Sequence, residues 1–368
     1  MRGPVKIITV VGARPQFIKA AAVSRVISSD FSGFIQEKII HTGQHFDENM
    51  SKVFFDELSI PKPHYHFDIS GGGHGSMTGK MLEAVENVLL QEKPDWLLVY
   101  GDTNSTLAGA LAAAKLHIPV AHVEAGLRSF NMRMPEEINR ILADRVATQL
   151  FCPTQTAVNN LAAEGIFQEV YNVGDVMYDV ALYYKESARN ESKVFQRLPI
   201  KSKSYILATC HRAENTDDKN NLQQILTGLF FASKKMPVVF PLHPRTKKLI
   251  ESFGLKDLLG NLIVVEPLPF LDMVALEQDA HLILTDSGGV QKEAFFYNVP
   301  CITMRNETEW VETVELGWNY LVGANADLII GAVDLHEQRP PMRTSSMPYG
   351  NGGASKSILK QMMKNIIN

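Results

Sequence analysis

The sequence contains few cysteines, and their spacing points neither to a disulfide framework nor to a metal site. Cys152, Cys210 and Cys301 lie far apart in a chain of 368 residues, each in or beside an apolar run. An odd count without C-x-x-C spacing is typical of a protein from a reducing compartment. We therefore expect buried thiols that pack as small hydrophobic groups, and a cytoplasmic protein.

The sequence also lacks a long hydrophobic run and a strong excess of either charge. No apolar window reaches the length of a membrane span, and the residues before the first predicted strand do not form the apolar segment of a signal peptide. The net charge of −4 argues against a general nucleic-acid or membrane-surface binder. We therefore expect neither nucleic acid nor membrane among its partners.

A dinucleotide-binding fingerprint is absent where it would be expected. Predicted strand 5–11 is followed by Gly12-Ala13-Arg14-Pro15 rather than G-x-G-x-x-G, which disfavours a bound nicotinamide cofactor. His64, His66 and His74 have no cysteines or carboxylates nearby at a metal-ligand spacing. We expect no cofactor and no metal.

What the sequence does contain is a regular alternation of apolar, strand-length runs with amphipathic helical stretches. Strands rich in Val, Ile and Leu and separated by helices predict parallel sheets covered on both faces. The sequence therefore predicts an α/β fold with two Rossmann-like, doubly wound domains. The predicted strands are 5–11, 38–41, 96–100, 120–123, 150–152, 170–173, 205–209, 238–242, 262–265, 282–285 and 301–304, and the first-domain helices include 16–27, 77–90, 105–116 and 136–147.

The chain has more residues than an average single domain, so two domains are expected. We place the join at about residue 175, which gives domains 1–175 and 176–353. The glycine-rich segment 348–353 predicts a hinge, and a closing helix over 354–368 is expected to pack back on the first domain. The run Gly71-Gly72-Gly73-His74-Gly75 predicts a mobile loop.

The stretch from 282 to 294, LILTDSGGVQKEA, predicts a buried strand, a Ser287-Gly288-Gly289 corner and a helix. The first N–H groups of such a helix lack internal partners, and with the helix dipole they bind phosphate. Glu293 falls about one turn into the helix, where a carboxylate can accept hydrogen bonds from a ribose diol. An ordinary strand-to-helix turn with Ser287 as N-cap explains this motif alone equally well.

Charged residues follow the carboxyl ends of several predicted strands, where ligands bind in open parallel sheets. Any one of them could be a helix cap or a surface ion pair, and Glu136 with Arg140 could be an i,i+4 pair. Together they favour a site for a negatively charged, hydroxyl-rich ligand in a cleft between two facing domains. The first domain contributes Arg14, Lys19, Asp102, Glu124 and Arg128, and the second contributes His211, Arg212, His243, Arg245 and Asp286.

Six motifs stand in the order found in one family. They are Gly12-Ala13-Arg14-Pro15, Tyr100-Gly101-Asp102-Thr103, His122-Val123-Glu124-Ala125-Gly126-Leu127-Arg128, Pro135-Glu136-Glu137-x-Asn139-Arg140, His211-Arg212-x-Glu214-Asn215 and Asp286-Ser287-Gly288-Gly289. In these motifs, and over nearly its whole length, the chain resembles the non-hydrolysing UDP-N-acetylglucosamine 2-epimerases.

The resemblance implies a fold of the glycosyltransferase B type that binds a UDP-sugar. It implies an isomerase that inverts C2 to give the manno epimer, for precursors of bacterial surface polysaccharides, and a homodimer formed through the first domain. Ser287, Gly288 and Gly289 would hold the pyrophosphate, Glu293 the ribose and Phe270 the uracil. Arg14, His211, His243 and Arg305 would line the phosphates or the sugar, and Lys19, Asp102, Glu124 and Glu136 would lie around the sugar ring. Arg140 is a further substrate-binding candidate.

The chemistry can be argued from the residues as well. A C2 hydrogen has no adjacent carbonyl, so either a neighbouring carbon is oxidised, which needs the absent nicotinamide site, or UDP leaves C1 first. The second route needs electrostatic stabilisation of the leaving diphosphate, for which Arg14, His211 and the Ser287 turn are suited. It also needs acids and bases at C2, for which Asp102, Glu124 and Glu136 are candidates. The sequence does not distinguish which of the three takes the proton.

Two further features concern the substrate. Family members that are activated by a second substrate molecule carry a basic residue after a Gln-His pair, whereas here Gln44-His45 is followed by Phe46-Asp47. Three other segments are more similar to the branch acting on UDP-2,3-diacetamido-2,3-dideoxy-glucuronic acid: the glycine-rich run, Met132-Arg133-Met134 and 308–312. The carboxylate of that sugar could meet Arg133 or His74.

The rival functions are a UDP-sugar glycosyltransferase, a hydrolysing 2-epimerase and a non-catalytic nucleotide-sugar sensor.

Overall fold

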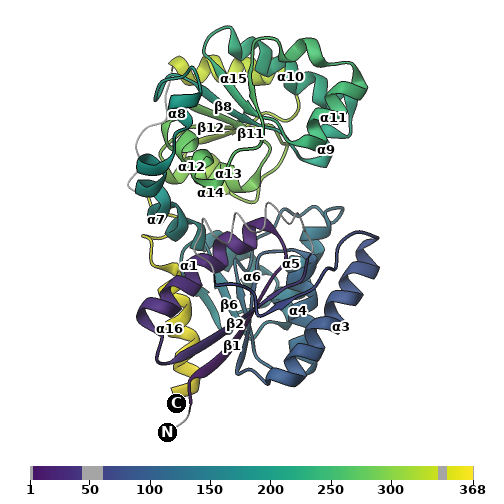
Figure 1. The fold of residues 1–368 in the computed structure, drawn as a ribbon, viewed down its shortest axis with the longest axis vertical. Helices are drawn as coiled ribbons and strands as arrows, with labels where there is room; N and C mark the ends of the chain where they lie inside the picture. Colours follow the sequence, from purple (N-terminus) through teal and green to yellow (C-terminus); the bar gives the residue numbers. More distant parts are fainter. Residues whose placement is uncertain (1–2, 44–60, 339–345, 368) are drawn as a thin grey trace. The chain divides into compact units, whose positions relative to one another are not determined.

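The chain forms two compact units. The computed structural model describes residues 3–43, 61–338 and 346–367. Unit 1 comprises Met1–Val180 and Met347–Asn368, and unit 2 comprises Ala181–Ser346 (Figure 1). The join predicted at about residue 175 lies directly before helix α7 (Val176–Glu191), and the boundary between the units lies inside that helix.

Unit 1 contains a seven-stranded sheet in the order β3-β2-β1-β4-β5-β6-β7, and every pairing is parallel. The inner strands β4 and β5 are buried at every position, as expected when both faces of a parallel sheet are covered. The strands are β1 (Val5–Val11), β2 (Ile35–His41), β3 (Tyr65–His66), β4 (Trp96–Tyr100), β5 (Val120–Val123), β6 (Gln149–Cys152) and β7 (Val170–Asn172).

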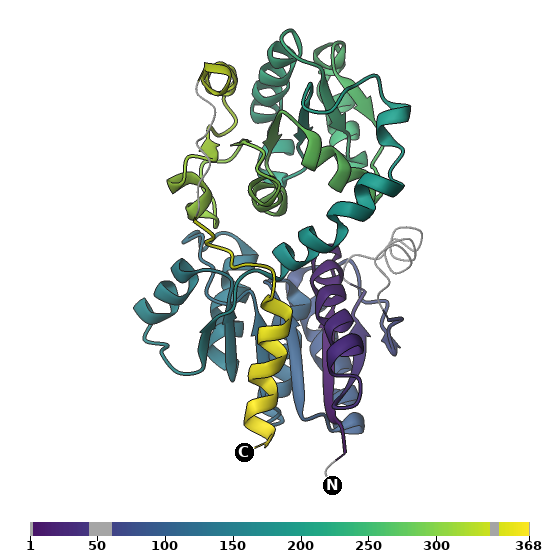
Figure 2. The same ribbon diagram turned by 90° about the vertical axis from the view of Figure 1, so that its left-hand side faces the viewer.

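Helices cover both faces of this sheet. Helices α3, α4 and α5 form one layer, and α1 and α16 lie side by side in the other (Figures 1 and 2). Right-handed crossovers place the connections on opposite faces, because the strand order runs one way from β1 and the other way from β4. The helices are α1 (Arg14–Asp30), α3 (His74–Glu92), α4 (Asn104–Lys115), α5 (Pro135–Val146), α6 (Gln155–Ala163) and α16 (Ala354–Ile367).

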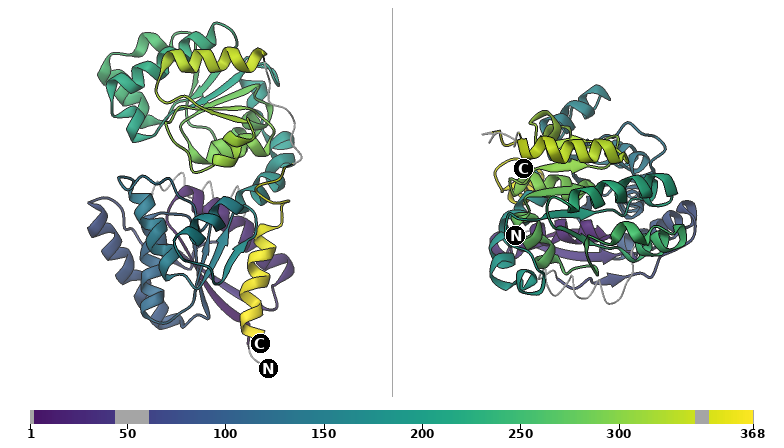
Figure 3. Two further views of the ribbon diagram at one scale, coloured as in Figure 1. Left: turned by 180° about the vertical axis from the view of Figure 1, so that it is seen from behind. Right: turned by 90° about the horizontal axis from the view of Figure 1, so that it is seen from above.

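Unit 2 also contains a parallel sheet, with six strands in the order β10-β9-β8-β11-β12-β13. Helices α10 and α15 pack against each other there (Figure 3). The strands are β8 (Ile206–Thr209), β9 (Val238–Pro241), β10 (Ile263–Val265), β11 (Leu282–Thr285), β12 (Cys301–Thr303) and β13 (Asn319–Leu321). The helices are α8 (Val194–Arg197), α9 (Ala213–Thr216), α10 (Lys219–Ser233), α11 (Pro244–Phe253), α12 (Phe270–Asp279), α13 (Gly288–Phe296), α14 (Val311–Glu315) and α15 (Ala326–Gln338), with a 3₁₀ turn at Lys256–Leu259.

Both strand orders create a topological switch point, in unit 1 between β1 and β4 and in unit 2 between β8 and β11. At such a point the connections after the two strands depart in opposite directions and leave a crevice at the carboxyl edge. The segments that follow these four strands begin at Gly12, Gly101, Cys210 and Asp286. The topology therefore places the motifs found in the sequence at the positions where ligands bind in this class of fold.

The predicted α/β class with two parallel, doubly wound sheets is confirmed. The prediction missed the short strands β3 and β13, which contain two and three residues. It was wrong for part of the glycine-rich run, because α3 begins at His74 and includes Gly75, with Gly73 as its N-cap. Glycine is tolerated at a helix N-terminus, so the loop ends earlier than its composition suggests. Gln44-His45-Phe46-Asp47 lies outside the described residues.

The C-terminal helix belongs to unit 1. Asp179 of α7 accepts hydrogen bonds from the Ala354 and Ser355 N–H groups at 3.1 and 2.8 Å, which caps α16. Lys356 then pairs with Asp30 at the end of α1, at 2.6 Å. Just before α7, the Asp175 N–H donates to the Tyr349 carbonyl. The chain therefore passes between the units twice, through segments that touch each other.

Within the described residues, no helix is both long and apolar enough to cross a membrane. All three cysteines are buried and free.

Gly174 lies close to the second connecting segment. Its φ is +83°, and a Cβ there would lie 2.8 Å from the Tyr349 carbonyl oxygen. Gly165 has a similar φ of +77°, with nothing within 4 Å of a built Cβ. We expect Gly165→Ala to lower the free energy of unfolding by roughly 1–2 kcal/mol through the left-handed backbone alone. Gly174→Ala should lower it by about 1–3 kcal/mol more, through the additional clash.

Urea denaturation of both variants, followed by circular dichroism, measures this difference. If both variants lose the same free energy of unfolding, the added methyl group at Gly174 does not clash with the Tyr349 carbonyl, and the prediction is wrong.

Candidate functional site

The carboxyl edge of the unit 1 sheet brings together two ion pairs. Asp102 follows β4, and its carboxylate accepts a hydrogen bond from Arg140 of α5 at 2.6 Å. Glu124 follows β5, and its carboxylate pairs with Lys19 of α1. A Cβ at Gly101 would lie 3.2 Å from the Glu124 carboxylate and 3.4 Å from the Lys19 ammonium. The second ion pair therefore lies directly against the turn that carries Asp102.

Glu124 has an unusual backbone conformation for a residue with a side chain. Its φ is +69°, in the left-handed region, and its N–H donates to the Phe151 carbonyl at 3.0 Å. Such a conformation costs on the order of 1–3 kcal/mol and persists mainly where the surrounding structure enforces it. Strained residues of this kind gather at functional sites, which supports a role for Glu124 in chemistry.

Glu136 and Glu137 lie in the first turn of α5 but differ in their surroundings. Glu136 is partly buried. Glu137 is 1% exposed, accepts hydrogen bonds from the Ser129 and Phe130 N–H groups, and pairs with Arg140 at 2.8 Å. Burial raises the pKa of the Glu137 carboxyl, but these donors outweigh burial, so its pKa lies below the usual value.

The spacing of Glu136 and Arg140 allows an i,i+4 ion pair. The structure gives Arg140 an i,i+3 partner, Glu137, together with Asp102. The signal for Glu137 was its place in the Pro-Glu-Glu motif, but one sequence could not separate two adjacent glutamates. The buried one holds the loop before α5 and orients Arg140, which leaves Glu136 as the carboxylate available to a ligand.

Gln16 is a second residue that the sequence analysis missed. Its side chain is buried, its Oε1 accepts from the Gly12 N–H at 2.8 Å, and its Nε2 donates to the Tyr100 carbonyl at 2.9 Å. It thus joins the turns after β1 and β4, the two strands at the switch point. Its Oε1 also accepts from the N–H of the N-cap Ala13 at 3.1 Å, which is one half of a capping box. Because alanine has no side-chain acceptor, the full capping-box signature is absent from the sequence. Arg14 begins α1, and its side chain lies outside the described part of the structure.

In unit 2, the predicted strand–turn–helix is confirmed in residues 282–296. Ser287 is the N-cap of α13, and its Oγ accepts from the Val290 N–H at 3.5 Å. Gly289 is exposed, and a Cβ there would meet only the Glu293 carboxylate and the Ser287 hydroxyl, both at 3.9 Å. The N-terminus of α13 is therefore open to an anion, with Glu293 one turn further along.

The neighbouring turn carries His211 and is held by a fully buried carboxylate. Asp286 accepts hydrogen bonds from the His211 N–H at 3.0 Å and the Arg212 N–H at 2.9 Å. The His211 ring lies 6.4 Å from the ring of His243, the N-cap of α11. Partial burial, with the charges of His211 and Arg245, lowers the pKa of His243. His211, His243 and the start of α13 thus share the carboxyl edge of the second sheet.

Several residues assigned to the site are buried, namely Lys19, Arg140, Phe270, Gly288 and Arg305. Arg305 is 2% exposed, and its guanidinium lies 3.2 Å from the carboxylates of both Glu309 and Glu214. Phe270 is 4% exposed and packs edge-to-face against Tyr184, with ring centroids 5.2 Å apart. Stacking of Phe270 on uracil stays a prediction, since the ring here is part of the core.

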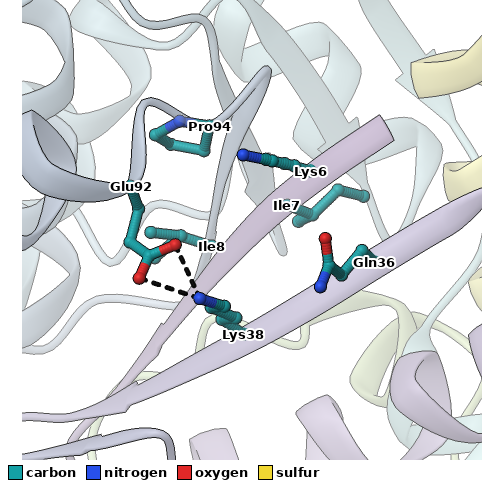
Figure 4. Close-up of a pocket in the computed structure, with 7 residues that line it drawn as sticks. All are labelled: Lys6, Ile7, Ile8, Gln36, Lys38, Glu92 and Pro94. Atoms are coloured by element: carbon teal, nitrogen blue, oxygen red, sulfur yellow. Dashed lines mark hydrogen bonds and ion pairs between the residues drawn. The ribbon is translucent and has the colours of Figure 1, made fainter. Parts of the chain in front are cut away.

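Other features of the described residues do not indicate a site. The described residues contain no cluster of three or more His, Cys, Asp or Glu that could hold a metal ion. A small hollow in unit 1 is lined by Lys6, Ile7, Ile8, Gln36, Lys38, Glu92 and Pro94 (Figure 4). Lys38 and Glu92 form an ion pair there, at 2.7 Å. Because its β1 residues come from the start of the strand, this hollow does not belong to the carboxyl edge of the sheet.

Comparison with known proteins gives a consistent result. A family model described as UDP-N-acetylglucosamine 2-epimerase matches residues 30–363. The chain is 52% identical to UDP-2,3-diacetamido-2,3-dideoxy-D-glucuronate 2-epimerase of Pseudomonas aeruginosa, over 98% of this chain and 99% of the relative. It is 46% identical to UDP-N-acetylglucosamine 2-epimerase of Methanocaldococcus jannaschii, over 96% of this chain and 98% of the relative.

Solved structures agree with this. The Methanocaldococcus jannaschii UDP-GlcNAc 2-epimerase in complex with UDP-GlcNAc and UDP is similar, with a TM-score of 0.90 and 44% identity over 98% of this chain and 100% of that one. The Neisseria meningitidis enzyme bound to UDP-GlcNAc gives a TM-score of 0.90 and 33% identity over the same shares. The resemblance found in the sequence motifs is thereby confirmed: the chain belongs to the UDP-N-acetylglucosamine 2-epimerase family of isomerases.

Proposed function

We propose that the protein inverts C2 of a UDP-2-acetamido sugar without hydrolysing it. The substrate pair would be UDP-GlcNAc and UDP-ManNAc, or the corresponding 2,3-diacetamido uronates. The observation that carries this proposal is the pairing of Asp102 with Arg140 and of Glu124 with Lys19 at the carboxyl edge of one sheet. A diphosphate site at the start of α13 and membership of the family support it. The product would serve as a precursor of surface polysaccharides.

The reaction would proceed by elimination and re-addition. A carboxylate removes the C2 proton, the electron pair of the C2–H bond forms a C1=C2 double bond, and the C1–O bond breaks with its electrons going to UDP. The diphosphate oxygen then attacks C1 of the 2-acetamidoglucal, while an acid protonates C2 from the opposite face. Because the nucleotide returns to C1, no water and no cofactor are consumed.

The residues of the two units would take separate parts in these steps. Ser287, Gly288, Gly289 and His211 would stabilise the leaving diphosphate, with Glu293 on the ribose. Asp102, Glu124 and Glu136 would exchange the proton at C2, while Lys19 and Arg140 hold two of these carboxylates in place. Arg14, His243 and Arg305 complete the set that we assign to the phosphates or the sugar. Acids and bases placed in this way contribute about 10²–10⁴-fold each.

Replacing the carboxylates tests the chemistry. We expect Asp102→Asn, Glu124→Gln and Glu136→Gln each to lower kcat by roughly 10²–10⁴-fold, because each would remove a proton-transfer group. The affinity for UDP should change little, since the proposed diphosphate contacts, apart from Arg14, lie in unit 2. The assay follows deuterium incorporation at C2 in deuterated water by proton NMR, with UDP affinity from calorimetry.

The matched control is Glu83→Gln, which changes an exposed carboxylate on α3. Near-normal deuterium exchange at C2 in all three site variants would contradict the proposed mechanism.

Gly289→Ala tests the diphosphate site. The new methyl group meets only ordinary contacts, so the melting temperature should not fall. It would stand between an incoming phosphate and the exposed N–H groups of α13, so UDP affinity should fall by on the order of tenfold, about 1.4 kcal/mol. Gly331→Ala, in α15 and with nothing near its added Cβ, is the control, and both variants are measured by thermal unfolding and UDP titration. Unchanged UDP binding by Gly289→Ala would place the diphosphate elsewhere.

Incubation with a UDP-sugar alone separates the rival functions. A glycosyltransferase would leave the sugar unchanged without an acceptor. A hydrolysing epimerase would release free N-acetylmannosamine and UDP, whereas the proposed reaction keeps the nucleotide attached. A non-catalytic sensor would bind UDP and show no exchange at C2, both in the native chain and after neutral replacements of Asp102 and Glu124.

For the exact sugar, we propose the 2,3-diacetamido uronate. The relative acting on that sugar is 52% identical. In this chain Arg133 is exposed in a loop that Glu137 holds, with its N–H bonded to Asn131. The exposed His74 lies 3.3 Å from Asn104, which accepts a hydrogen bond from Asn139. Either side chain could meet a sugar carboxylate.

We expect Arg133→Gln or His74→Asn to lower kcat/KM for the uronate by on the order of tenfold, the value of one surface-accessible charge contact. Turnover of UDP-GlcNAc, if present, should stay unchanged. Kinetics on both UDP-sugars measures this, and exclusive use of the neutral sugar would exclude the uronate assignment.

We also propose a cytoplasmic homodimer formed through unit 1. The buried free thiols suit a reducing compartment. Ile138 and Leu142, one turn apart on α5, are 41% and 42% exposed and could form part of the interface. Light scattering of the native chain and of Leu142→Lys tests this: a monomeric native chain would contradict the proposal.

A further inference from the structure

The turn that carries Asp102 is held by side chains from three other elements. Its three consecutive carbonyls each accept a side-chain hydrogen bond. Gln16 of α1 donates to the Tyr100 carbonyl at 2.9 Å, His122 of β5 donates to the Gly101 carbonyl at 2.8 Å, and Asn139 of α5 donates to the Asp102 carbonyl at 2.9 Å. Backbone carbonyls in such a turn would otherwise be satisfied by water or by neighbouring N–H groups. The position of Asp102 is therefore fixed by distant parts of the chain.

His122 differs from the other two donors because it is titratable and each of its two ring nitrogens faces a hydrogen-bond acceptor. Nε2 lies 2.8 Å from the Gly101 carbonyl oxygen, and Nδ1 lies 2.8 Å from the Asp144 carboxylate. The side chain is fully buried. A carbonyl and a carboxylate both accept, so the ring satisfies both only with a proton on each nitrogen.

The partner of His122 is kept ionised by further donors. Asp144 of α5 accepts hydrogen bonds from the Gly126 N–H at 3.1 Å and the Arg128 guanidinium at 2.8 Å. Burial raises the pKa of the Asp144 carboxyl, but His122 and Arg128 outweigh it, and the pKa lies below the usual value. An ionised Asp144 cannot donate to the imidazole, so the Nδ1 proton belongs to His122.

His122 also stands two residues before Glu124 on β5. Its bond to Gly101 therefore ties the turn that carries Asp102 to the strand that delivers Glu124. Gly101 is also the residue whose added Cβ would contact the Glu124–Lys19 pair. A change at His122 would alter the spacing of two proposed proton-transfer groups without touching the ligand.

We propose that His122, protonated on both nitrogens, is a positioning residue whose Nε2–H bond to the Gly101 carbonyl sets the distance between Asp102 and Glu124. This inference rests on the proposed epimerase function. It assigns His122 an effect on the proton-transfer steps and none on the diphosphate site, which lies in unit 2. Misplacement of reacting groups by about 1 Å can lower a rate by on the order of 10²-fold.

Two substitutions separate the two hydrogen bonds of the ring. In His122→Asn the amide nitrogen takes the place of Nδ1, so the bond to Asp144 is kept and the bond to Gly101 is lost. In His122→Gln the amide nitrogen reaches the place of Nε2, so the bond to Gly101 is kept. We expect kcat to fall by about 10²-fold in the Asn variant and by less than about tenfold in the Gln variant. KM and UDP affinity should be unchanged in both.

The measurement is C2 exchange in deuterated water at saturating UDP-sugar, alongside melting temperature and UDP titration. If the native enzyme exchanges C2 and the two variants have equal kcat, the positioning role is wrong. If the native enzyme shows no exchange with any UDP-2-acetamido sugar, the proposed function itself fails, and the positioning role with it. Equal loss of stability with the expected difference in kcat still supports the proposal.

A second measurement does not depend on the variants folding. Nitrogen-15 NMR of the histidine-labelled native enzyme should show a proton on both ring nitrogens of His122, assigned by loss of its signals in either variant or, if neither folds, by its coupling to the Gly101 carbonyl. One unprotonated nitrogen would overturn the proposal, because the ring could then not donate to both Gly101 and Asp144.

Discussion

Parallel pairing is the constraint on which the rest of this structure depends. Parallel strands cannot be joined by tight turns, so connections in the described residues cross a face of the sheet, for example through α1, α4 and α5 in unit 1. Every strand of a sheet then ends at the same edge, and the reversal of strand order opens that edge between β1 and β4 and between β8 and β11. Asp102, Glu124 and Lys19 lie at the carboxyl edge of the first sheet, and His211 and Gly289 at that of the second. They lie there because each follows the end of a parallel strand or belongs to the helix that begins beyond it.

A second regularity is that buried carboxylates hold the functional loops through backbone N–H groups. Glu137 binds the N–H groups of the loop before α5, Asp144 binds that of Gly126, and Asp286 binds those of the His211 turn. In each case a cation or a second donor completes the set, which offsets the cost of burying the charge. Loops held in this way need no regular structure to keep a fixed shape. The proposed chemical groups can therefore sit on loops and still be placed accurately.

Much of this architecture could be predicted from the sequence because strands of Val, Ile and Leu alternate with amphipathic helices. The strands over 5–11, 96–100, 120–123 and 282–285 were predicted with their observed bounds. β3 has only two residues, Tyr65 and His66, which carry no periodicity. β13 has three residues, as do β7, β10 and β12, which were predicted, but it begins with the polar Asn319. The predicted division of the chain and the roles of the site residues remain predictions.

The supporting residues of the site were the least visible in the sequence. Gln16, His122 and Glu137 act through hydrogen bonds to the backbone, in the case of Gln16 to a segment 84 residues away, and no local pattern predicts such bonds. Glu137 could not be separated from Glu136 by spacing alone. The burial of Phe270 and Arg305 could not be predicted either. An apolar residue at a helix start, or a basic residue just after a strand, fits a core and a ligand site equally well. Charged motifs at strand ends are visible in one sequence, whereas the partners that orient them are not.

The double passage of the chain between the units has a consequence for synthesis on the ribosome. Unit 1 is completed by α16, which follows unit 2 in the sequence and is capped by Asp179, 175 residues earlier. The whole of unit 2 must therefore be translated before the first sheet receives its final covering helix. Until then α1 lacks its neighbour, so the nascent first unit exposes apolar surface while the second one forms.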